Sequence, residues 1–196
     1  HLRMAQELAE DLQLDTVRFI PAASPPHKDA PIISAEQRAA MVKLAIANNS
    51  TFVFDDRELL RAGTSYTVDT LHSLRTELGK DTSITLFMGS DAFTKFDTWH
   101  RWQEIFGLAN VLVISRPGAL GSWPAALQAE VQQRRVSSAE LLCAKAQGGV
   151  LFLRDLQWDI SSTQVREELR RHSGALALLP PAVASYIRTH GLYAQD

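Results

Sequence analysis

The stretch Ile84-Thr85-Leu86-Phe87-Met88, followed by Gly89-Ser90-Asp91, decides the fold class. A nearly continuous apolar run of this length is expected of a strand that is buried on both faces. Val111-Leu112-Val113-Ile114-Ser115 has the same pattern and ends on Arg116-Pro117-Gly118. Two such strands predict the core of a parallel sheet, in which loops at the carboxyl ends of strands are the usual place for a ligand.

Helices and strands alternate around these two runs. β-rich runs predict further strands at 16–20, 51–55 and 150–153, and a charged loop is predicted at 56–63. Apolar residues at helical spacing, with a capping box at Ser34 and Gln37, predict helices at 1–14, 34–47, 68–78 and 123–145. We therefore predict an α/β fold with a doubly wound parallel sheet and a small helical C-terminal part. The α/β domain is placed at residues 1–175, and the helical segment, packed on it, at 176–196.

Composition argues against several classes of protein. The 196 residues are 45% hydrophobic, which is enough to bury a proper core. Twenty Lys and Arg against 22 Asp and Glu give a formal net charge of -2, so nothing favours a nucleic-acid groove or an acidic-membrane surface. No apolar run approaches the length of a membrane span. The single cysteine, Cys143, excludes an internal disulfide framework and suits a reducing cytoplasm.

A hydroxyl-rich helix start is predicted in Asp159-Ile160-Ser161-Ser162-Thr163-Gln164-Val165-Arg166. Ser161 is a good N-cap, and Gln164 completes a capping box. Free N–H groups, clustered hydroxyls and Arg166 one turn into the helix favour an anion, for which a phosphate chain is the candidate. Taken alone, the stretch favours an ordinary capped helix with a solvated arginine, because Ser/Thr caps are common and binding sites are few.

Nucleophilic or zinc chemistry by the protein has little support. The six histidines include no pair at ligand spacing on one helix face, so we predict no metal site built by the protein. There is no Gly-x-Ser-x-Gly motif, and Cys143 is more typical of a packing residue than of a nucleophile. Gly, hydroxyl, His and Arg residues at strand ends instead suit the binding of a nucleotide whose own phosphate reacts.

A series of short motifs resembles bacterial nicotinate-nucleotide adenylyltransferases, in the same order and over essentially the whole chain. The motifs are His1-Leu2-Arg3-Met4-Ala5, Phe19-Ile20-Pro21 with Pro25-Pro26-His27-Lys28, Asp56-Arg57-Glu58-Leu59, Ser65-Tyr66-Thr67, Gly89-Ser90-Asp91, Thr98-Trp99-His100-Arg101-Trp102, Arg116-Pro117-Gly118 and Ile160-Ser161-Ser162-Thr163-Gln164-Val165-Arg166. No single motif is specific, but their combination is. The resemblance implies a Rossmann-like nucleotidyltransferase fold.

One signature of the wider nucleotidyltransferase superfamily, Gly-x-Phe-Asp-Pro-x-His-x-Gly-His, is represented here only by its last histidine, His1. On this resemblance, the first strand, its Gly-rich turn and another catalytic histidine are expected to stand before His1.

The resemblance implies that nicotinic acid mononucleotide attacks the α-phosphorus of ATP, giving deamido-NAD and pyrophosphate, with Mg²⁺ accompanying ATP. It implies that His1 and Arg166 are the catalytic residues and grip the phosphates of ATP. The ATP-binding set that it implies is Gly89, Asp91, Arg116, Ser161, Ser162, Thr163 and Arg166.

The resemblance also implies a site for the nicotinate nucleotide. Trp99 offers a stacking face, while Thr67 and the backbone around His100 offer donors to the ring carboxylate. Donors without a compensating acceptor would favour the acid over the amide. The full set is His27, Lys28, Tyr66, Thr67, Trp99 and His100, with His27 and Lys28 contacting phosphate from the proline-rich loop.

Simpler interpretations stand beside these assignments. Trp99 and Trp102 also suit the core or an oligomer contact, because tryptophans are more often structural than stacked on ligands. Asp91 is placed to cap the helix that follows it, and Thr67 is expected to cap its own. Asp55 and Asp56 are expected to be exposed carboxylates at a strand end rather than a metal pair. Solvated or terminal residues are the alternative for His1, His27 and Lys28.

Two rival functions are left open by the sequence. A sister adenylyltransferase acting on phosphopantetheine would keep the phosphate apparatus, although the pairing of Ser65-Tyr66-Thr67 with Thr98-Trp99-His100 argues against it. The other rival is a nucleotide-binding module without catalysis. Neither nucleic acid nor a membrane is expected as a partner, and a homo-oligomer is left open.

Overall fold

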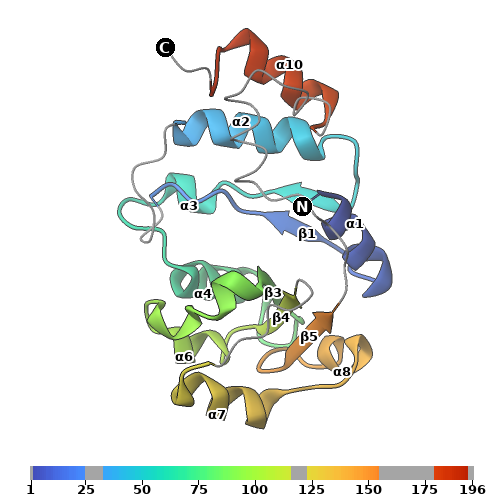
Figure 1. Ribbon diagram of the computed structural model, residues 1–196, viewed down its shortest axis with the longest axis vertical. Helices are drawn as coiled ribbons and strands as arrows, with labels where there is room; N and C mark the ends of the chain where they lie inside the picture. Colours follow the sequence, from blue (N-terminus) through green and yellow to red (C-terminus); the bar gives the residue numbers. More distant parts are fainter. Residues whose placement is uncertain (1, 25–32, 116–122, 155–178, 194–196) are drawn as a thin grey trace. The chain divides into compact units, whose positions relative to one another are not determined.

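The computed structural model describes residues 2–24, 33–115, 123–154 and 179–193. The chain divides into two compact units, His1–Ser65 with Asp159–Asp196, and Tyr66–Trp158. Each unit has its own parallel sheet, and the coloured ribbon of Figure 1 follows the chain through both. Among the helices of the described ranges, none has the length and apolar character needed to cross a membrane.

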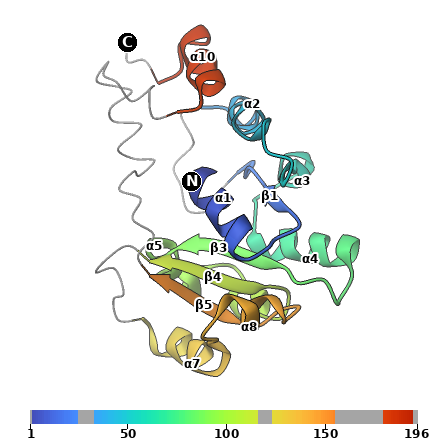
Figure 2. The same cartoon turned by 90° about the vertical axis from the view of Figure 1, so that its right-hand side faces the viewer.

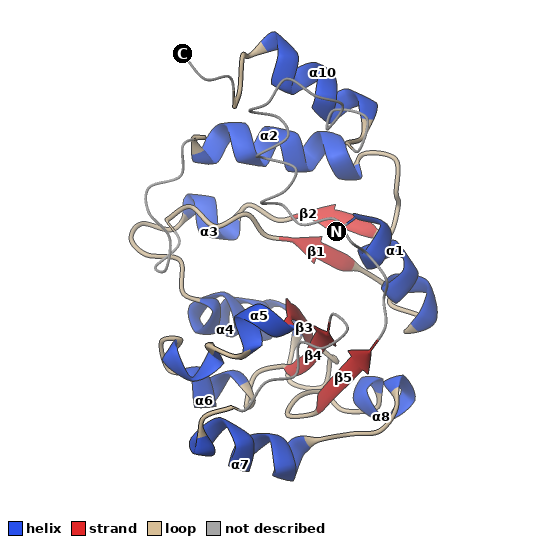
Figure 3. Cartoon of the chain, viewed as in Figure 1, coloured by secondary structure: helices blue, strands red, loops and turns tan. Residues whose placement is uncertain are grey.

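The first unit contains a two-stranded sheet. Its described elements are α1 (Leu2–Asp11), β1 (Val17–Phe19), α2 (Ala35–Ile46), β2 (Phe52–Phe54), α3 (Arg57–Leu60) and α10 (Pro181–Thr189). β1 and β2 pair in parallel, with Val17 opposite Phe52, and they are drawn side by side in red in Figure 3. α2 lies between them in sequence, as a parallel pair requires a crossover connection.

The predicted capping box at the start of α2 is confirmed. Ser34 Oγ accepts from the Gln37 N–H at 3.2 Å, and Gln37 Oε1 accepts from the Ser34 N–H at 3.3 Å. Pro181 lies in the first turn of α10, where a missing N–H costs nothing. α10 packs against α2, and its buried residues are Val183, Ala184 and Ile187.

A buried carboxylate ties the end of β2 to two arginines. Arg57 Nε donates to the two carboxylate oxygens of Asp55 at 2.9 and 2.8 Å, and an Arg18 guanidinium nitrogen donates at 3.1 Å. Burial would raise the pKa of Asp55, but the hydrogen bonds from Arg57 and Arg18 outweigh it and hold that pKa below its ordinary value of 3.8. The expectation of an exposed carboxylate is therefore wrong for Asp55, whose partners are cations of the protein itself.

Asp55→Asn is expected to lower the free energy of unfolding at neutral pH by about 2 kcal/mol, because hydrogen bonds between charged groups contribute about 1.5–3 kcal/mol. Since the folded pKa is depressed, this stabilisation is present above the ordinary value of 3.8 and is lost as the pH falls through the folded pKa. Urea denaturation at several pH values measures both effects. The exposed neighbour Asp56, changed to Asn, is the matched control. An equal loss in the control, or a loss in Asp55→Asn that persists unchanged in acid, would contradict this account.

The loop predicted at 56–63 contains a short helix, α3. The Leu59 and Leu60 N–H groups both donate to the Asp56 carbonyl oxygen, at 2.8 and 3.1 Å. Leu60 is 79% exposed, so α3 lacks the apolar face from which helices are predicted. The charged sequence at 56–63 therefore did not predict this helix.

The second unit contains a three-stranded sheet in the order β3-β4-β5. Its described elements are α4 (Thr67–Leu78), β3 (Thr85–Gly89), α5 (Ser90–Phe93), the 3-10 helix η1 (Phe96–Thr98), α6 (Trp102–Ile105), β4 (Asn110–Ser115), α7 (Ala125–Arg134), α8 (Ala139–Cys143) and β5 (Val150–Arg154). Figure 2 shows the three strands side by side. The parallel register sets Gly89 beside Ile114 and Ser115 beside Arg154, so the carboxyl ends of all three strands meet at one edge.

Burial differs between the two strands that decided the fold class. In β4, Val111, Leu112 and Val113 are fully buried, which confirms the prediction for this strand. The prediction of burial on both faces is wrong for β3, where Leu86 and Phe87 are only half-buried. In the described sheet, β4 has a partner strand on each side while β3 has one, which accounts for the difference.

Two helices, α7 and α8, replace the single helix predicted at 123–145. Between them, Arg135 forms a parallel bridge with Val150, and the Val136 N–H donates to the Val150 carbonyl oxygen at 2.9 Å. Ser138 then caps α8 by accepting from the Leu141 N–H at 3.3 Å. Pairing with β5 and a strong N-cap satisfy the backbone groups that a continuous helix would otherwise have paired.

Candidate active site

The carboxyl end of β3 leads directly into α5. Gly89 is exposed and forms the N-cap of α5, with an extended backbone at φ -76° and ψ 155°. A Cβ at Gly89 would meet no atom of the described chain within 4 Å, so its backbone is open to a ligand. Asp91 is exposed in the first turn of α5. The alternative that Asp91 caps this helix is wrong, because Gly89 holds the cap position and Asp91 is already helical.

Ser115 ends β4 at the same edge of the sheet. It is 3% exposed, and its Oγ has no hydrogen-bond partner among the described residues. A buried hydroxyl without a partner costs about 1–3 kcal/mol. Ser115 lies at the carboxyl edge of the sheet, next to the candidate site, where it closes an apolar strand directly before Arg116.

Two distant segments of the second unit meet at an aromatic contact. The ring centroids of Tyr66 and His100 lie 4.3 Å apart, with an angle of 32° between the ring planes. Tyr66 immediately precedes α4, and His100 lies between η1 and α6. The contact brings together the two segments that the resemblance assigns to the nicotinate nucleotide.

The start of α4 has no side-chain cap within the described part of the chain. Tyr66 is the N-cap residue and makes no side-chain cap hydrogen bond, while Thr67 is the first helical residue. The prediction that Thr67 caps its own helix is therefore wrong, because the helix begins with Thr67 itself. The first turn already carries the Asp69 carboxylate, and the Asp69 N–H donates to the Tyr66 carbonyl oxygen at 3.2 Å, so an acceptor at this end would meet the N–H groups of Thr67 and Val68.

An aromatic cluster holds the turn that carries Trp99. Phe96 is fully buried and stacks on Phe93 with ring centroids 5.6 Å apart, and the Trp99 ring tilts against Phe96 at 5.3 Å. Phe93 ends α5, so the cluster connects Trp99 to the helix that carries Asp91. Trp99 is half-buried. Trp102 is also half-buried and packs edge-on against Phe96 at 6.1 Å.

Comparison with known proteins decides the family. Residues 1–168 match the cytidylyltransferase-like family. A probable nicotinate-nucleotide adenylyltransferase of Dechloromonas aromatica is 45% identical, over 98% of this chain and 90% of its own length. Another, of Methylococcus capsulatus, is 40% identical over 100% of this chain and 93% of its own length. The chain belongs to the nicotinate-nucleotide adenylyltransferase family.

Solved adenylyltransferase structures share this fold. Nicotinic acid mononucleotide adenylyltransferase of Plasmodium falciparum, complexed with NaAD, aligns with a TM-score of 0.66 at 15% identity, over 97% of this chain and 89% of that one. The same enzyme complexed with APC also gives a TM-score of 0.66, over 96% of this chain. At this identity the likeness concerns the fold alone, and it confirms the predicted parallel α/β nucleotidyltransferase fold.

Part of the site predicted for this adenylyltransferase lies outside the described residues. These residues are His1, His27, Lys28, Arg116, Ser161, Ser162, Thr163 and Arg166. The chain that approaches His27 is held in the first unit, where Ser65 Oγ accepts from the Ala23 N–H at 3.1 Å. Arg38 donates to the carbonyl oxygens of Ala22 and Ala23, at 2.7 and 3.2 Å. Sequence reasoning missed Arg38, because an arginine on a helix is usually a solvated charge.

In the described part of this adenylyltransferase, no side chains are arranged for metal binding or for thiol chemistry. Within those ranges, no three His, Cys, Asp or Glu side chains are grouped so as to hold a metal ion. Burial raises the pKa of the Cys143 thiol above its ordinary value of 9.0, a direction that disfavours the reactive thiolate. Mg²⁺ therefore stays a prediction that belongs with the ATP substrate.

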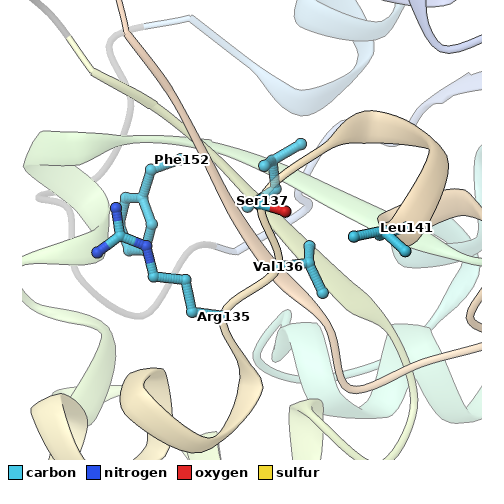
Figure 4. A pocket seen from close by; sticks show the side chains of 6 residues that line it. Arg135, Val136, Ser137, Leu141 and Phe152 are labelled. Atoms are coloured by element: carbon cyan, nitrogen blue, oxygen red, sulfur yellow. The ribbon is translucent and has the colours of Figure 1, made fainter.

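A separate cavity of about 500 Å³ opens beside the edge strand β5 (Figure 4). Its lining is Arg135, Val136, Ser137, Leu141, Leu151 and Phe152. The Arg135 guanidinium lies over the Phe152 ring, 5.5 Å from its centroid. None of the predicted site residues is in this described lining, so the cavity does not form the predicted nicotinate pocket.

Proposed function

We propose that this chain transfers the adenylyl group of ATP to nicotinic acid mononucleotide, giving deamido-NAD and pyrophosphate in NAD biosynthesis. The observation that carries the proposal is the contact of Tyr66 with His100, which joins the uncapped start of α4 to the Trp99 turn in a chain of this family. An aromatic face beside the N–H donors of a helix start supports a pyridine ring that bears a carboxylate.

The reaction needs no protein nucleophile. A phosphate oxygen of nicotinic acid mononucleotide attacks the α-phosphorus of ATP, and a new P–O bond forms. The bond from the α-phosphorus to the α,β-bridging oxygen breaks, and pyrophosphate leaves with the electron pair. The protein contributes alignment and stabilisation of the charge on the leaving group, while Mg²⁺ enters with ATP.

Gly89 and Asp91 form the adenosine side of the proposed ATP site. The open backbone at Gly89 supports a close approach of adenosine, and the exposed Asp91 carboxylate supports acceptance from ribose hydroxyls. Phosphate contacts are assigned to His1, Arg116, Ser161, Ser162, Thr163 and Arg166. His1 and Arg166 carry the catalytic role in this assignment.

The nicotinate side rests on the second unit. Trp99 stacks on the pyridine ring, and Thr67 with the backbone around His100 donates to its carboxylate. Tyr66 holds His100 in place through the ring contact. His27 and Lys28 contact phosphate. The single cysteine and the biosynthetic role support a cytoplasmic location.

The assignment is tested by the choice of acceptor. The full-length protein is incubated with ATP, Mg²⁺ and either nicotinic acid mononucleotide or 4′-phosphopantetheine, and pyrophosphate release is followed. We expect pyrophosphate release with nicotinic acid mononucleotide and none with 4′-phosphopantetheine. Mass spectrometry should identify deamido-NAD as the product. Pyrophosphate release with 4′-phosphopantetheine and not with the mononucleotide would show that phosphopantetheine is the acceptor. Nucleotide binding without pyrophosphate release would indicate a non-catalytic module.

A further inference from the structure

The residue directly after His100 has an unusual backbone. Arg101 adopts the left-handed conformation, with φ 52° and ψ 40°, and serves as the N-cap residue of α6. For a residue with a Cβ this conformation costs free energy, and it persists where the surrounding structure determines it. Among the described residues of the second unit, Arg101 is the only one other than glycine with a positive φ.

Four charged or titratable side chains surround this turn, and we call them the Arg101 cluster: Arg101, Glu104, Asp69 and His72. Arg101 Nε and a terminal nitrogen donate to the two carboxylate oxygens of Glu104, at 2.8 and 2.6 Å. Another terminal nitrogen of Arg101 lies 3.7 Å from Asp69 Oδ1, and His72 Nε2 is in hydrogen-bond contact with Glu104 Oε1. Asp69 and His72 belong to the first half of α4.

The cluster therefore connects the turn to α4 by a second route, besides the contact of Tyr66 with His100. One route is aromatic and holds the side chain of His100. The other is ionic and holds the backbone next to it. Hydrogen bonds from His72 and Arg101 hold the pKa of Glu104 below its ordinary value of 4.5, so the carboxylate stays charged at neutral pH.

The Arg101 cluster stabilises its own turn more than it stabilises the whole fold. Its side chains are 36% to 46% exposed, and ion pairs at that exposure contribute little to global stability. The fork from Arg101 to Glu104 has the bidentate geometry that makes such pairs directional. The cluster is therefore better suited to fixing one turn than to stabilising the fold.

We propose that Arg101 is a positioning residue for the nicotinate nucleotide, which ties the turn of Trp99 and His100 to the first half of α4. In this way it sets the spacing between the stacking face and the carboxylate donors near Thr67. The inference rests on the proposed function. Arg101 itself does not touch substrate; its effect passes through Trp99 and the backbone of His100.

Substitution of Arg101 should act on one substrate only. Arg101→Ala is expected to raise KM for nicotinic acid mononucleotide about tenfold, because small misplacements of binding groups are costly. KM for ATP and kcat should stay within about twofold, and the melting temperature should change little, as for other exposed ion pairs. Arg101→Lys keeps the charge without the fork and should give a smaller rise. The KM of Arg101→Gly should also be lower than that of Arg101→Ala, because glycine adopts the left-handed conformation without cost.

Glu104→Gln tests the other end of the fork. It should raise the same KM, and the double variant with Arg101→Ala should raise it further than either single variant, because Arg101 contacts Asp69 and Glu104 contacts His72, so only the double variant disturbs both links to α4. The matched control is Glu130→Gln on α7, which removes the negative charge of the group that accepts a 2.8 Å hydrogen bond from Arg134. The control should leave both KM values unchanged.

The outcomes separate the two levels of inference. Turnover by the wild-type enzyme with an unchanged KM in Arg101→Ala would overturn the positioning role alone. An equal loss for ATP and for the mononucleotide, together with a lower melting temperature, would also overturn it, since that is the signature of a structural residue. Absence of turnover by the wild type would overturn the proposed function and, with it, this inference.

Discussion

Arg166→Ala is expected to lower kcat by about 100- to 1,000-fold, the usual cost of removing one donor to charge that develops in the transition state. The motivation is the sequence Ser161-Ser162-Thr163, with Arg166 one turn further along the predicted helix. Here the developing charge is on the leaving pyrophosphate. Arg166 lies outside the described residues, so the prediction rests on the motif and the family.

Single-turnover kinetics and a denaturation curve measure this effect and its specificity. The unfolding free energy should change by no more than about 0.5 kcal/mol, as for a surface residue. Arg166→Lys should recover activity in part, because a point charge does not replace a forked donor. Arg171→Ala removes a guanidinium from the same predicted helix and is the matched control. An unchanged kcat in Arg166→Ala would return this arginine to the interpretation of a solvated surface charge.

Trp99→Ala is expected to raise KM for nicotinic acid mononucleotide about 10- to 100-fold, since stacking of a heteroaromatic ring on an aromatic side chain is worth roughly 1–3 kcal/mol. Trp99 is half-buried against Phe96, which fixes its ring while leaving part of it accessible. Trp99→Phe keeps an aromatic face and should restore most of the affinity. KM for ATP should stay unchanged in both variants.

Trp102→Phe provides the internal control for this experiment. Trp102 belongs to the same aromatic cluster, packing against Phe96 and Phe106 with ring centroids 6.1 Å away in each case. We expect the control to lower the free energy of unfolding without raising KM. If Trp102→Phe raised KM as much as Trp99→Ala, the stacking role of Trp99 would be lost, and both tryptophans would be structural.

The features that could be predicted are those encoded in short stretches. The apolar runs at 84–88 and 111–115 identified two parallel strands, of which β4, but not β3, has the burial that such runs predict. Ser34 and Gln37 fixed the start of α2, because a capping box satisfies two backbone donors within one turn. The motif pairs likewise predicted that the segments at 65–67 and 98–100 belong together, and the contact of Tyr66 with His100 shows that the two segments are close in space.

The features that could not be predicted depend on contacts between distant residues. The break between α7 and α8 arises from pairing of Arg135 with Val150, which helical propensity does not encode. The left-handed backbone of Arg101 accompanies contacts with α4 that are distant in sequence, because Arg101 lies 3.7 Å from Asp69 and its partner Glu104 contacts His72. The caps assigned to Thr67 and Asp91 were wrong by one or two residues, within the usual spread of helix boundaries.

The most direct test of the central claim compares the acid with the amide. The full-length protein is given ATP and Mg²⁺ with nicotinic acid mononucleotide or with nicotinamide mononucleotide, and pyrophosphate release is followed for both. We predict kcat/KM at least about fivefold higher for the acid, because hydrogen bonds to a charged acceptor exceed those to a neutral one by roughly 1 kcal/mol or more. Faster release with the amide would contradict the carboxylate site at the start of α4, and no release with either would contradict the adenylyl transfer itself.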